Sequence, residues 1–319
     1  MYISRIATDG REQLTADHLK ETAEYASILG GKFRSSALVR TASFFHDMGK
    51  FSDEFIQYLR ISVQSKKDGG NARRRGSVIH ATQGAKYIFE AALSEKELFL
   101  VLAAEIIAIC IAGHHGGLMD SISSQGETSL RNRLTTDKDA LNYEEVMVAF
   151  EKESVLTENL KDLMGACREE LSGFIEVCKN EKLNILFMVH MLVKSVFSCL
   201  VDSDRYNAYC FEIGKMPETQ LSVPPWEEYT RRLEQHITTF LDGSEITCIR
   251  HDISEKCLNA SVRPRGVYRL DVPTGGGKTL SSLRFALNHA KEHNMEHIIY
   301  VIPYLSVLDQ TAKEIKKAL

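Results

Sequence analysis

The stretch "TASFFHDMGK", residues 41–50, ends an apolar helical pattern in His46-Asp47 and Gly49-Lys50. A normal helix end accounts for these residues, because glycine often follows the last turn and lysine suits the negative end of the helix dipole. His46 alone is equally well read as a hydrogen-bonded core histidine. A functional site becomes the better interpretation only if partner residues occur elsewhere in the chain.

The composition is that of a globular protein. The chain has 319 residues, 44% hydrophobic and 26% charged, which is enough for two domains. Because the net charge is -4 and the pI is near 6.3, nucleic-acid binding would need a local basic patch.

Cysteine usage and the apolar runs bear on localisation. The 7 cysteines include no C-x-x-C pair, which favours a reduced, cytosolic compartment. The N-terminus lacks a signal-peptide pattern, and the apolar run 98–112 contains Glu105 and is too short to cross a bilayer. We expect a soluble cytoplasmic protein with no membrane partner.

The prolines divide the chain. All 6 lie beyond residue 216, and the preceding part shows apolar residues at helical spacing. The predicted fold is mainly α: an all-helical domain at 1–215, a linker at 216–245, and a partial α/β lobe at 246–319. The lobe is expected to contain strands at 266–272 and 297–303 around a helical stretch at 279–293.

Histidines and aspartates recur at the ends of the predicted helices. Imidazoles gathered from several helices, together with a carboxylate, suit a transition metal inside a helical bundle. The tandem His114-His115 at a buried helix end favours a metal site over separate core histidines. The candidate ligands are His18, His46, Asp47, His80, His114, His115, Asp202 and Asp204.

This order of residues resembles the HD superfamily of metal phosphohydrolases. The segments "FFHDMGKFSDEFIQYL", "IAGHHGGLMD" and "FSCLVDSDRYNA" resemble the HD nuclease domain of the CRISPR-associated helicase-nuclease of type I interference systems, over residues about 10–215. That family degrades the DNA strand exposed when an RNA-guided complex opens its target. The resemblance therefore implies single-stranded DNA and an RNA-guided surveillance complex as partners of a monomer.

The resemblance also implies residue roles. Asp204 is preferred to Asp202 as the closing ligand because it follows a small residue, Ser203, and the two carboxylates point to different helix faces. Asp202 remains the alternative. The implied metal ligands are His18, His46, Asp47, His80, His114, His115 and Asp204, with Asp47 and Lys50 catalytic.

The ligand set suggests a chemistry. Asp47 can bridge two metals roughly 3.5–4 Å apart, which activate a water for in-line displacement at phosphorus. Lys50 would neutralise developing phosphate charge. Because imidazoles dominate, the two divalent metals are expected to be Mn, Ni, Co, Fe or Zn in preference to Mg.

A basic run precedes His80. It is either a solvated loop or a strip that guides DNA through phosphate contacts. Its residues are Lys66, Lys67, Arg73, Arg74 and Arg75.

A glycine loop, "VPTGGGKTL", follows a predicted strand and precedes a predicted helix, the context of a phosphate-binding loop. It resembles superfamily 2 helicase loops, so weak binding of ATP with Mg is expected. The predicted nucleotide-binding residues are Thr274, Gly275, Gly276, Gly277, Lys278 and Thr279. No Walker B carboxylate follows before Leu319, so ATPase and helicase activity are not expected from this chain.

Three functions remain open at this point. The first is a metal-dependent nuclease on single-stranded DNA in antiviral defence. The second is an HD phosphohydrolase acting on nucleotides, and the third is a non-catalytic module that docks the surveillance complex.

Overall fold

The computed structural model describes residues 1–67, 78–120, 122, 125–126, 128–153, 159–218, 224–240 and 242–319. It divides into two compact units, unit 1 at Met1–Thr219 and unit 2 at Gln220–Leu319. Each unit is described by itself below.

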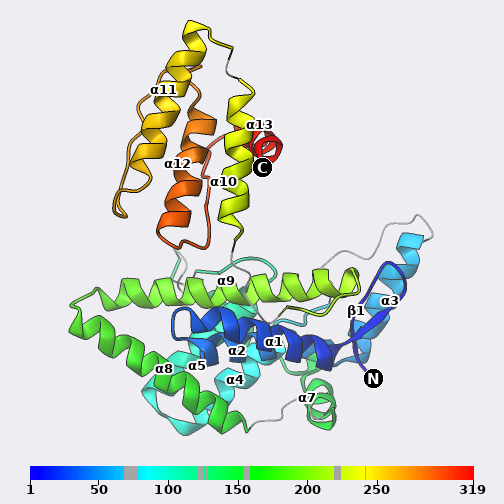
Figure 1. Cartoon of the computed structure of the whole chain (residues 1–319). Helices are drawn as coiled ribbons and strands as arrows, with labels where there is room; N and C mark the ends of the chain where they lie inside the picture. Colours follow the sequence, from blue (N-terminus) through cyan, green and yellow to red (C-terminus); the bar gives the residue numbers. More distant parts are fainter. Residues whose placement is uncertain are drawn as a thin grey trace. The chain divides into compact units, whose positions relative to one another are not determined.

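Unit 1 is a helical bundle preceded by a small hairpin (Figure 1). Its helices and strands are β1 (Ile3–Ile6), β2 (Glu12–Leu14), α1 (Thr15–Gly31), α2 (Ser36–Phe45), the 3-10 turn η1 (Met48–Lys50), α3 (Asp53–Lys67), α4 (Thr82–Glu95), α5 (Leu98–Gly113), α6 (Ser129–Leu134), η2 (Asp139–Leu141), α7 (Tyr143–Lys152), α8 (Leu160–Asn180) and α9 (Ile185–Glu212).

The core of unit 1 forms around α2 and α5. Helix α5 is apolar except for Glu105 and is buried over most of its length, as expected for a central helix of a bundle. Helix α2 packs against α1, α5, α8 and α9, so its C-terminal end lies deep in the bundle. The apolar pattern that ends at residue 45 therefore delivers His46 and Asp47 to the interior.

Helix α9 lies along α1, as Figure 1 shows. By length and composition alone α9 could cross a membrane. In this structure its inward side packs Leu192, Val196 and Leu200 into the core of unit 1. The helix is therefore part of the folded bundle.

The mainly helical fold is confirmed, with one addition in unit 1. Residues 1–215 were expected to be all-helical, yet β1 and β2 form an antiparallel hairpin that pairs Arg5 with Gln13. Asp9-Gly10 forms the turn, with the Gly10 amide donating to the Ala7 carbonyl at 2.9 Å. An Asp-Gly pair between short runs is a hairpin signal that outweighs the helical context.

Unit 2 contains α10 (Trp226–Thr238), α11 (Glu245–Ala260), α12 (Lys278–Glu292) and α13 (Leu305–Ala318). Helix α10 lies inside the segment expected to be a linker, and it packs against α12 because Leu233 joins Leu283 and Leu287 in a small core. The side chain of Trp226 donates to the Met295 carbonyl at 2.8 Å.

The strands predicted in unit 2 are not formed. Within residues 224–240 and 242–319 the structure assigns no β-strand, and both 266–272 and 297–303 are irregular. A strand requires ladder hydrogen bonds to a neighbouring strand. Val267, Ile299 and Val301 are highly exposed instead of lying on a buried sheet face. Strand propensity alone therefore does not produce a sheet here.

A glycine allows α4 to approach the end of α2. A Cβ added at Gly84 would lie within 2.9 Å of the Phe45 carbonyl carbon and closer still to its oxygen, so backbone would have to shift. Gly165, in α8, has nothing within 4 Å of such a Cβ. A side chain therefore has room at Gly165 and none at Gly84.

We predict that Gly84→Ala destabilises unit 1 by about 1–3 kcal/mol through overpacking. Gly165→Ala should instead stabilise it by roughly 0.5–1 kcal/mol, because alanine costs less conformational entropy in a helix. Urea unfolding followed by circular dichroism measures both. Equal stability of the two variants would contradict the close approach of α4 to Phe45.

Candidate metal centre

Asp47 lies at the middle of the site. It follows the C-cap of α2 and precedes η1, and its side chain is 1% exposed. Neither carboxylate oxygen has a hydrogen-bond partner among the described residues. Among the described residues the nearest cationic atom is Lys50 Nζ, 2.5 Å from Oδ2. Lys50 balances the charge of Asp47, but both oxygens keep lone pairs without donors, which a bound proton or metal ion would satisfy.

One oxygen of Asp47 faces the first group of ligands, which we call half-site A: His18, His46 and Asp204. Asp47 Oδ2 lies 3.3 Å from His18 Nε2 and 3.2 Å from His46 Nε2. Asp204 Oδ1 lies 3.4 Å and 3.8 Å from the same two nitrogens. Ligand atoms of the four residues all fall within 4.8 Å of one another.

The other oxygen faces the second group, half-site B: His80, His114 and His115. Asp47 Oδ1 lies 3.4 Å from His114 Nε2, 3.8 Å from His80 Nε2 and 3.9 Å from His115 Nε2. The Nε2 atoms of His80 and His115 are 2.7 Å apart. Asp47 thus joins two groups of imidazoles, one at each of its oxygens.

Gly49 brings His80 to this site. A Cβ at Gly49 would lie 2.5 Å from the Cα of His80, and the Gly49 amide donates to the His80 carbonyl at 3.2 Å. This glycine therefore serves close backbone approach. It lies inside η1 and does not end a helix as the sequence suggested, because α2 already ends at Phe45.

Hydrogen bonds fix the protons of four imidazoles away from Asp47. Nδ1 donates to a backbone carbonyl in three cases: His46 to Ser43 at 2.7 Å, His80 to Val78 at 2.9 Å and His114 to Ile111 at 2.7 Å. A carbonyl only accepts, so each Nδ1 carries a proton and each Nε2 points to the centre. His18 Nδ1 donates to Asn207 Oδ1 at 2.7 Å.

The pKa values agree with a site built for cations. Burial lowers the pKa of His18 and of His80 to about 4, so both are neutral near pH 7. Burial acts in the same direction on His46, but the carboxylates of Asp47 and Asp204 raise its pKa to about 9. In the absence of a metal ion, His46 therefore holds a proton next to the carboxylates of Asp47 and Asp204.

The donor set fits divalent metal ions. Two imidazole lone pairs, on His18 and His46, face each other with their Nε2 atoms 3.3 Å apart and need a cation or a proton between them. The Nε2 of His114 is buried and has no hydrogen-bond partner within the described parts of the chain. Imidazole donors with carboxylates are typical of Zn, Mn, Fe, Co and Ni sites.

Two cations flank the carboxylates. Lys50 is buried and donates to Ser4 Oγ at 3.1 Å. Arg5, on β1, places Nη2 3.4 Å from Asp204 Oδ1 with a side chain that is 23% exposed. Sequence reasoning found Lys50 but missed Arg5, whose only signal was its place in the Asp-Gly hairpin.

The remaining predicted residues lie away from the centre. Asp202 is exposed on α9, whereas Asp204 faces His18. Lys66 and Lys67 end α3. Arg73, Arg74 and Arg75 lie outside the described residues.

The predicted phosphate-binding loop lies in unit 2. Thr274, Gly275, Gly276 and Gly277 precede α12, which starts at Lys278 and Thr279. The loop borders a pocket of about 630 Å³ that Arg250 and Glu314 also line. Arg250 Nε donates to the Gly275 carbonyl at 2.9 Å, which holds the loop against α11.

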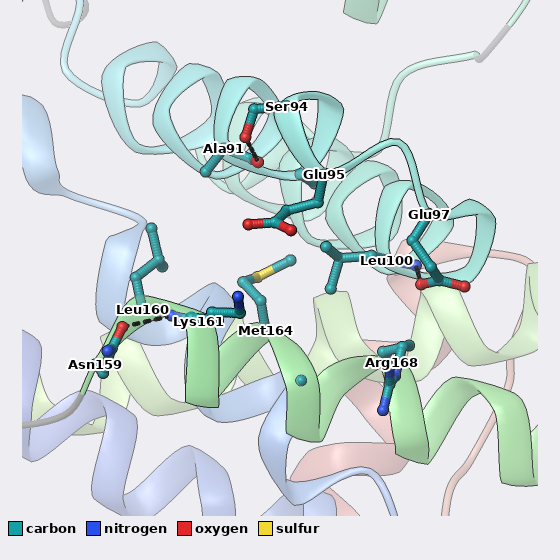
Figure 2. Close-up of a pocket in the computed structure, with 12 residues that line it drawn as sticks. Ala91, Ser94, Glu95, Glu97, Leu100, Asn159, Leu160, Lys161, Met164 and Arg168 are labelled. Atoms are coloured by element: carbon teal, nitrogen blue, oxygen red, sulfur yellow. Dashed lines mark hydrogen bonds between the residues drawn. The ribbon is translucent and has the colours of Figure 1, made fainter.

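Another hollow, of about 430 Å³, lies between the α4–α5 turn and α8 (Figure 2). Two of its polar side chains cap helices. Glu97 accepts hydrogen bonds at the start of α5, and Asn159 does so at the start of α8. None of its lining residues is a predicted ligand.

Two family models match the chain. The HD domain matches residues 15–164, and the family described as type III restriction enzyme, res subunit, matches residues 227–319. Residues 15–164 are therefore an HD domain, and a helicase-like region follows it, as the sequence predicts. HD domains bind divalent metals, and the His/Asp cluster of unit 1 could hold one.

Solved structures with similarity include Cas3 of T. fusca. Its AMPPNP complex is 15% identical, with 97% of this chain and 36% of that chain covered and a TM-score of 0.41. Another T. fusca Cas3 structure is 14% identical over 100% of this chain and 36% of that chain, with a TM-score of 0.43. A CRISPR-associated protein is 12% identical, with 96% and 36% covered and a TM-score of 0.36.

The chain thus spans about a third of the length of these proteins, 36% in each case. No curated protein matches the chain.

We predict that Asp47→Asn abolishes metal binding at both half-sites, because the two groups share only this carboxylate. Helical content should persist, since the bundle rests on apolar faces. Metal content by mass spectrometry and far-UV circular dichroism check this. A variant that retains full metal content would show that Asp47 is not the shared ligand.

Replacing the two aspartates of α9 should have unequal effects. Asp204→Ala is expected to weaken metal binding at half-site A at least tenfold, while Asp202→Ala, an exposed control on the same helix, leaves it unchanged. Titration with Mn²⁺ measures both. Weaker Mn²⁺ binding by Asp202→Ala than by Asp204→Ala would show that Asp202 is the ligand.

Proposed function

We propose that this chain is a metal-dependent nuclease that cleaves single-stranded DNA in RNA-guided antiviral defence. The observation that carries the proposal is the buried Asp47 carboxylate with a separate group of imidazoles at each oxygen. Such a pair of half-sites suits two ions that act on one phosphodiester. Bound there, divalent ions would supply an activated water and neutralise the attacking and leaving oxygens.

The chain's own residues prepare the site for a phosphate. Four histidines carry a proton on Nδ1, so Nε2 is the nitrogen that faces the metal site. On His46 a metal ion would replace the proton that the nearby carboxylates stabilise. Lys50 is held in place by Asp47 and Ser4 and contributes a fixed positive charge. Arg5 lies beside half-site A with a partly exposed side chain, so its guanidinium can hydrogen-bond a phosphate oxygen.

The exposure of half-site B supports the proposal that the substrate is a polymer. The side chain of His115 is 51% exposed although the neighbouring His114 is 1% exposed. A strand can therefore approach half-site B from solvent. This arrangement favours the nuclease over a phosphohydrolase that encloses a nucleotide.

We also propose that the basic run guides DNA to the centre. Helix α3 begins near the site, where the Phe55 ring contacts the ring of His80 at 5.0 Å between centroids. It ends at Lys66 and Lys67, so its axis leads from the metal ligands to the basic residues. Arg73, Arg74 and Arg75 follow in sequence.

The metals proposed are two divalent ions, Mn, Ni, Co, Fe or Zn in preference to Mg. Five imidazoles make up most of the donor set, and Mg favours oxygen ligands and retained water. The loop at Thr274–Thr279 is proposed to bind ATP with Mg weakly.

The proposed biological setting is CRISPR interference in the cytoplasm of a prokaryote. The order of an HD domain followed by a helicase-like region supports it, together with the motifs around His46, His114 and Asp204. We propose that the chain acts as a monomer on the strand exposed by an RNA-guided surveillance complex, without a membrane partner.

Circular single-stranded DNA provides the test of this function. With Mn²⁺ or Ni²⁺ the wild-type chain should open and degrade the circle, and a chelator or Asp47→Asn should stop cleavage. Release of phosphate from mononucleotides without strand scission would favour the phosphohydrolase instead. Metal binding with neither activity would favour a docking module.

Lys278→Ala should separate the two units functionally. The variant is expected to lose most binding of a fluorescent ATP analogue, because Lys278 is the loop's only cation. Its rate of cleavage of single-stranded DNA should equal that of the wild-type chain, since the metal ligands all belong to unit 1. Loss of DNA cleavage in this variant would show that the nucleotide loop takes part in the reaction.

A further inference from the structure

His18 differs from the other histidines in what holds its Nδ1 proton. His46, His80 and His114 donate to backbone carbonyls. His18 donates instead to the side chain of Asn207, on α9, at 2.7 Å. Thr22 Oγ1 lies farther from the same nitrogen, at 3.4 Å, so Asn207 is the main acceptor. The proton position of one ligand in half-site A thus depends on a side chain that a mutation can remove.

Asn207 is itself held in a fixed orientation. It is 1% exposed, its Nδ2 donates to Glu21 Oε2 at 2.6 Å, and its Oδ1 accepts from Gln13 Nε2 at 2.9 Å. A carboxylate accepts and does not donate, so the amide nitrogen must face Glu21 and the oxygen must face His18. Gln13 and Glu21 therefore determine which tautomer His18 adopts.

We infer that Asn207 is a positioning residue that sets the metal affinity of half-site A through His18. With Asn207 present, the lone pair of His18 Nε2 faces Asp47 Oδ2 and Asp204 Oδ1. Without it, the proton can move to Nε2, where it is stabilised by those carboxylates and blocks a metal. The inference rests on the metal centre of the proposed function and is independent of its DNA substrate.

The effect is confined to one half-site. His80 and His114 keep their backbone acceptors whatever happens at Asn207. Loss of an outer hydrogen-bond partner of a metal-binding histidine typically weakens metal binding roughly 10–100-fold. Half-site A should weaken by that factor while half-site B keeps its affinity.

The test uses the full chain loaded with Mn²⁺ and passed through a desalting column. The wild-type chain should retain about two ions per chain and show the electron paramagnetic resonance signal of a spin-coupled pair. Asn207→Ala should retain about one ion, show an uncoupled signal and bind its second ion roughly 10–100-fold more weakly in a titration. Asn132→Ala, an exposed asparagine on α6, is the matched control and should behave as wild type.

A second pair of variants separates positioning from damage to the fold. Glu21→Gln keeps an oxygen that accepts from Asn207 Nδ2 and should bind metal as wild type. Glu21→Leu removes the acceptor and should weaken half-site A alone. Both variants should melt as folded proteins by circular dichroism.

Three results would overturn the inference. They are wild-type affinity at both half-sites in Asn207→Ala, equal weakening of both half-sites, and identical metal binding by Glu21→Gln and Glu21→Leu. A wild-type chain that binds no metal would overturn it together with the metal centre. A wild-type chain that binds two ions but leaves DNA intact would instead refute only the proposed substrate.

Discussion

The cost of burying the Asp47 charge governs the arrangement of unit 1. A carboxylate taken out of water is stable only when it is paired or binds a metal. Lys50 supplies one positive charge, and the imidazole lone pairs around the two oxygens supply none unless a cation joins them. Arg5 pairs with Asp204, so two cations match the two carboxylates. The lone pairs of Asp47 and of the imidazole Nε2 atoms nevertheless lack donors unless protons or metal ions bind. His46, whose pKa is raised to about 9, supplies such a proton.

The fold meets this constraint with elements that are distant in sequence. Helix α1 brings His18, the end of α2 brings His46 and Asp47, and α9 brings Asp204. The N-terminal hairpin then ties α9 to the site, because Arg5 contacts Asp204 and Gln13 contacts Asn207. Arg11 strengthens this attachment by donating to the carbonyls of Phe211 and Glu212. The orientation of half-site A thus depends on residues at both ends of unit 1.

The sequence predicts the helical bundle and the candidate ligands because both depend on local patterns. Helical spacing of apolar residues gives the bundle, and helix-terminal histidines with His46-Asp47 give the ligands. Helical geometry alone shows that Asp202 and Asp204 lie on different faces, but only packing shows that Asp204 faces inward. The contacts of Arg5 and Asn207 could not be predicted from the sequence, because they form only where the hairpin packs against α9. In unit 2 the strand-type residues Val267 and Val301 form no strand, because pairing requires partners that local propensity does not provide.

Anomalous diffraction from crystals grown with Mn²⁺ tests the central claim most directly. The account predicts two peaks, one at each oxygen of Asp47, roughly 3.5–4 Å apart and within bonding distance of the Nε2 atoms of His46 and His114. A single peak, or ions that do not share Asp47, would contradict the claim that this carboxylate joins two metal half-sites.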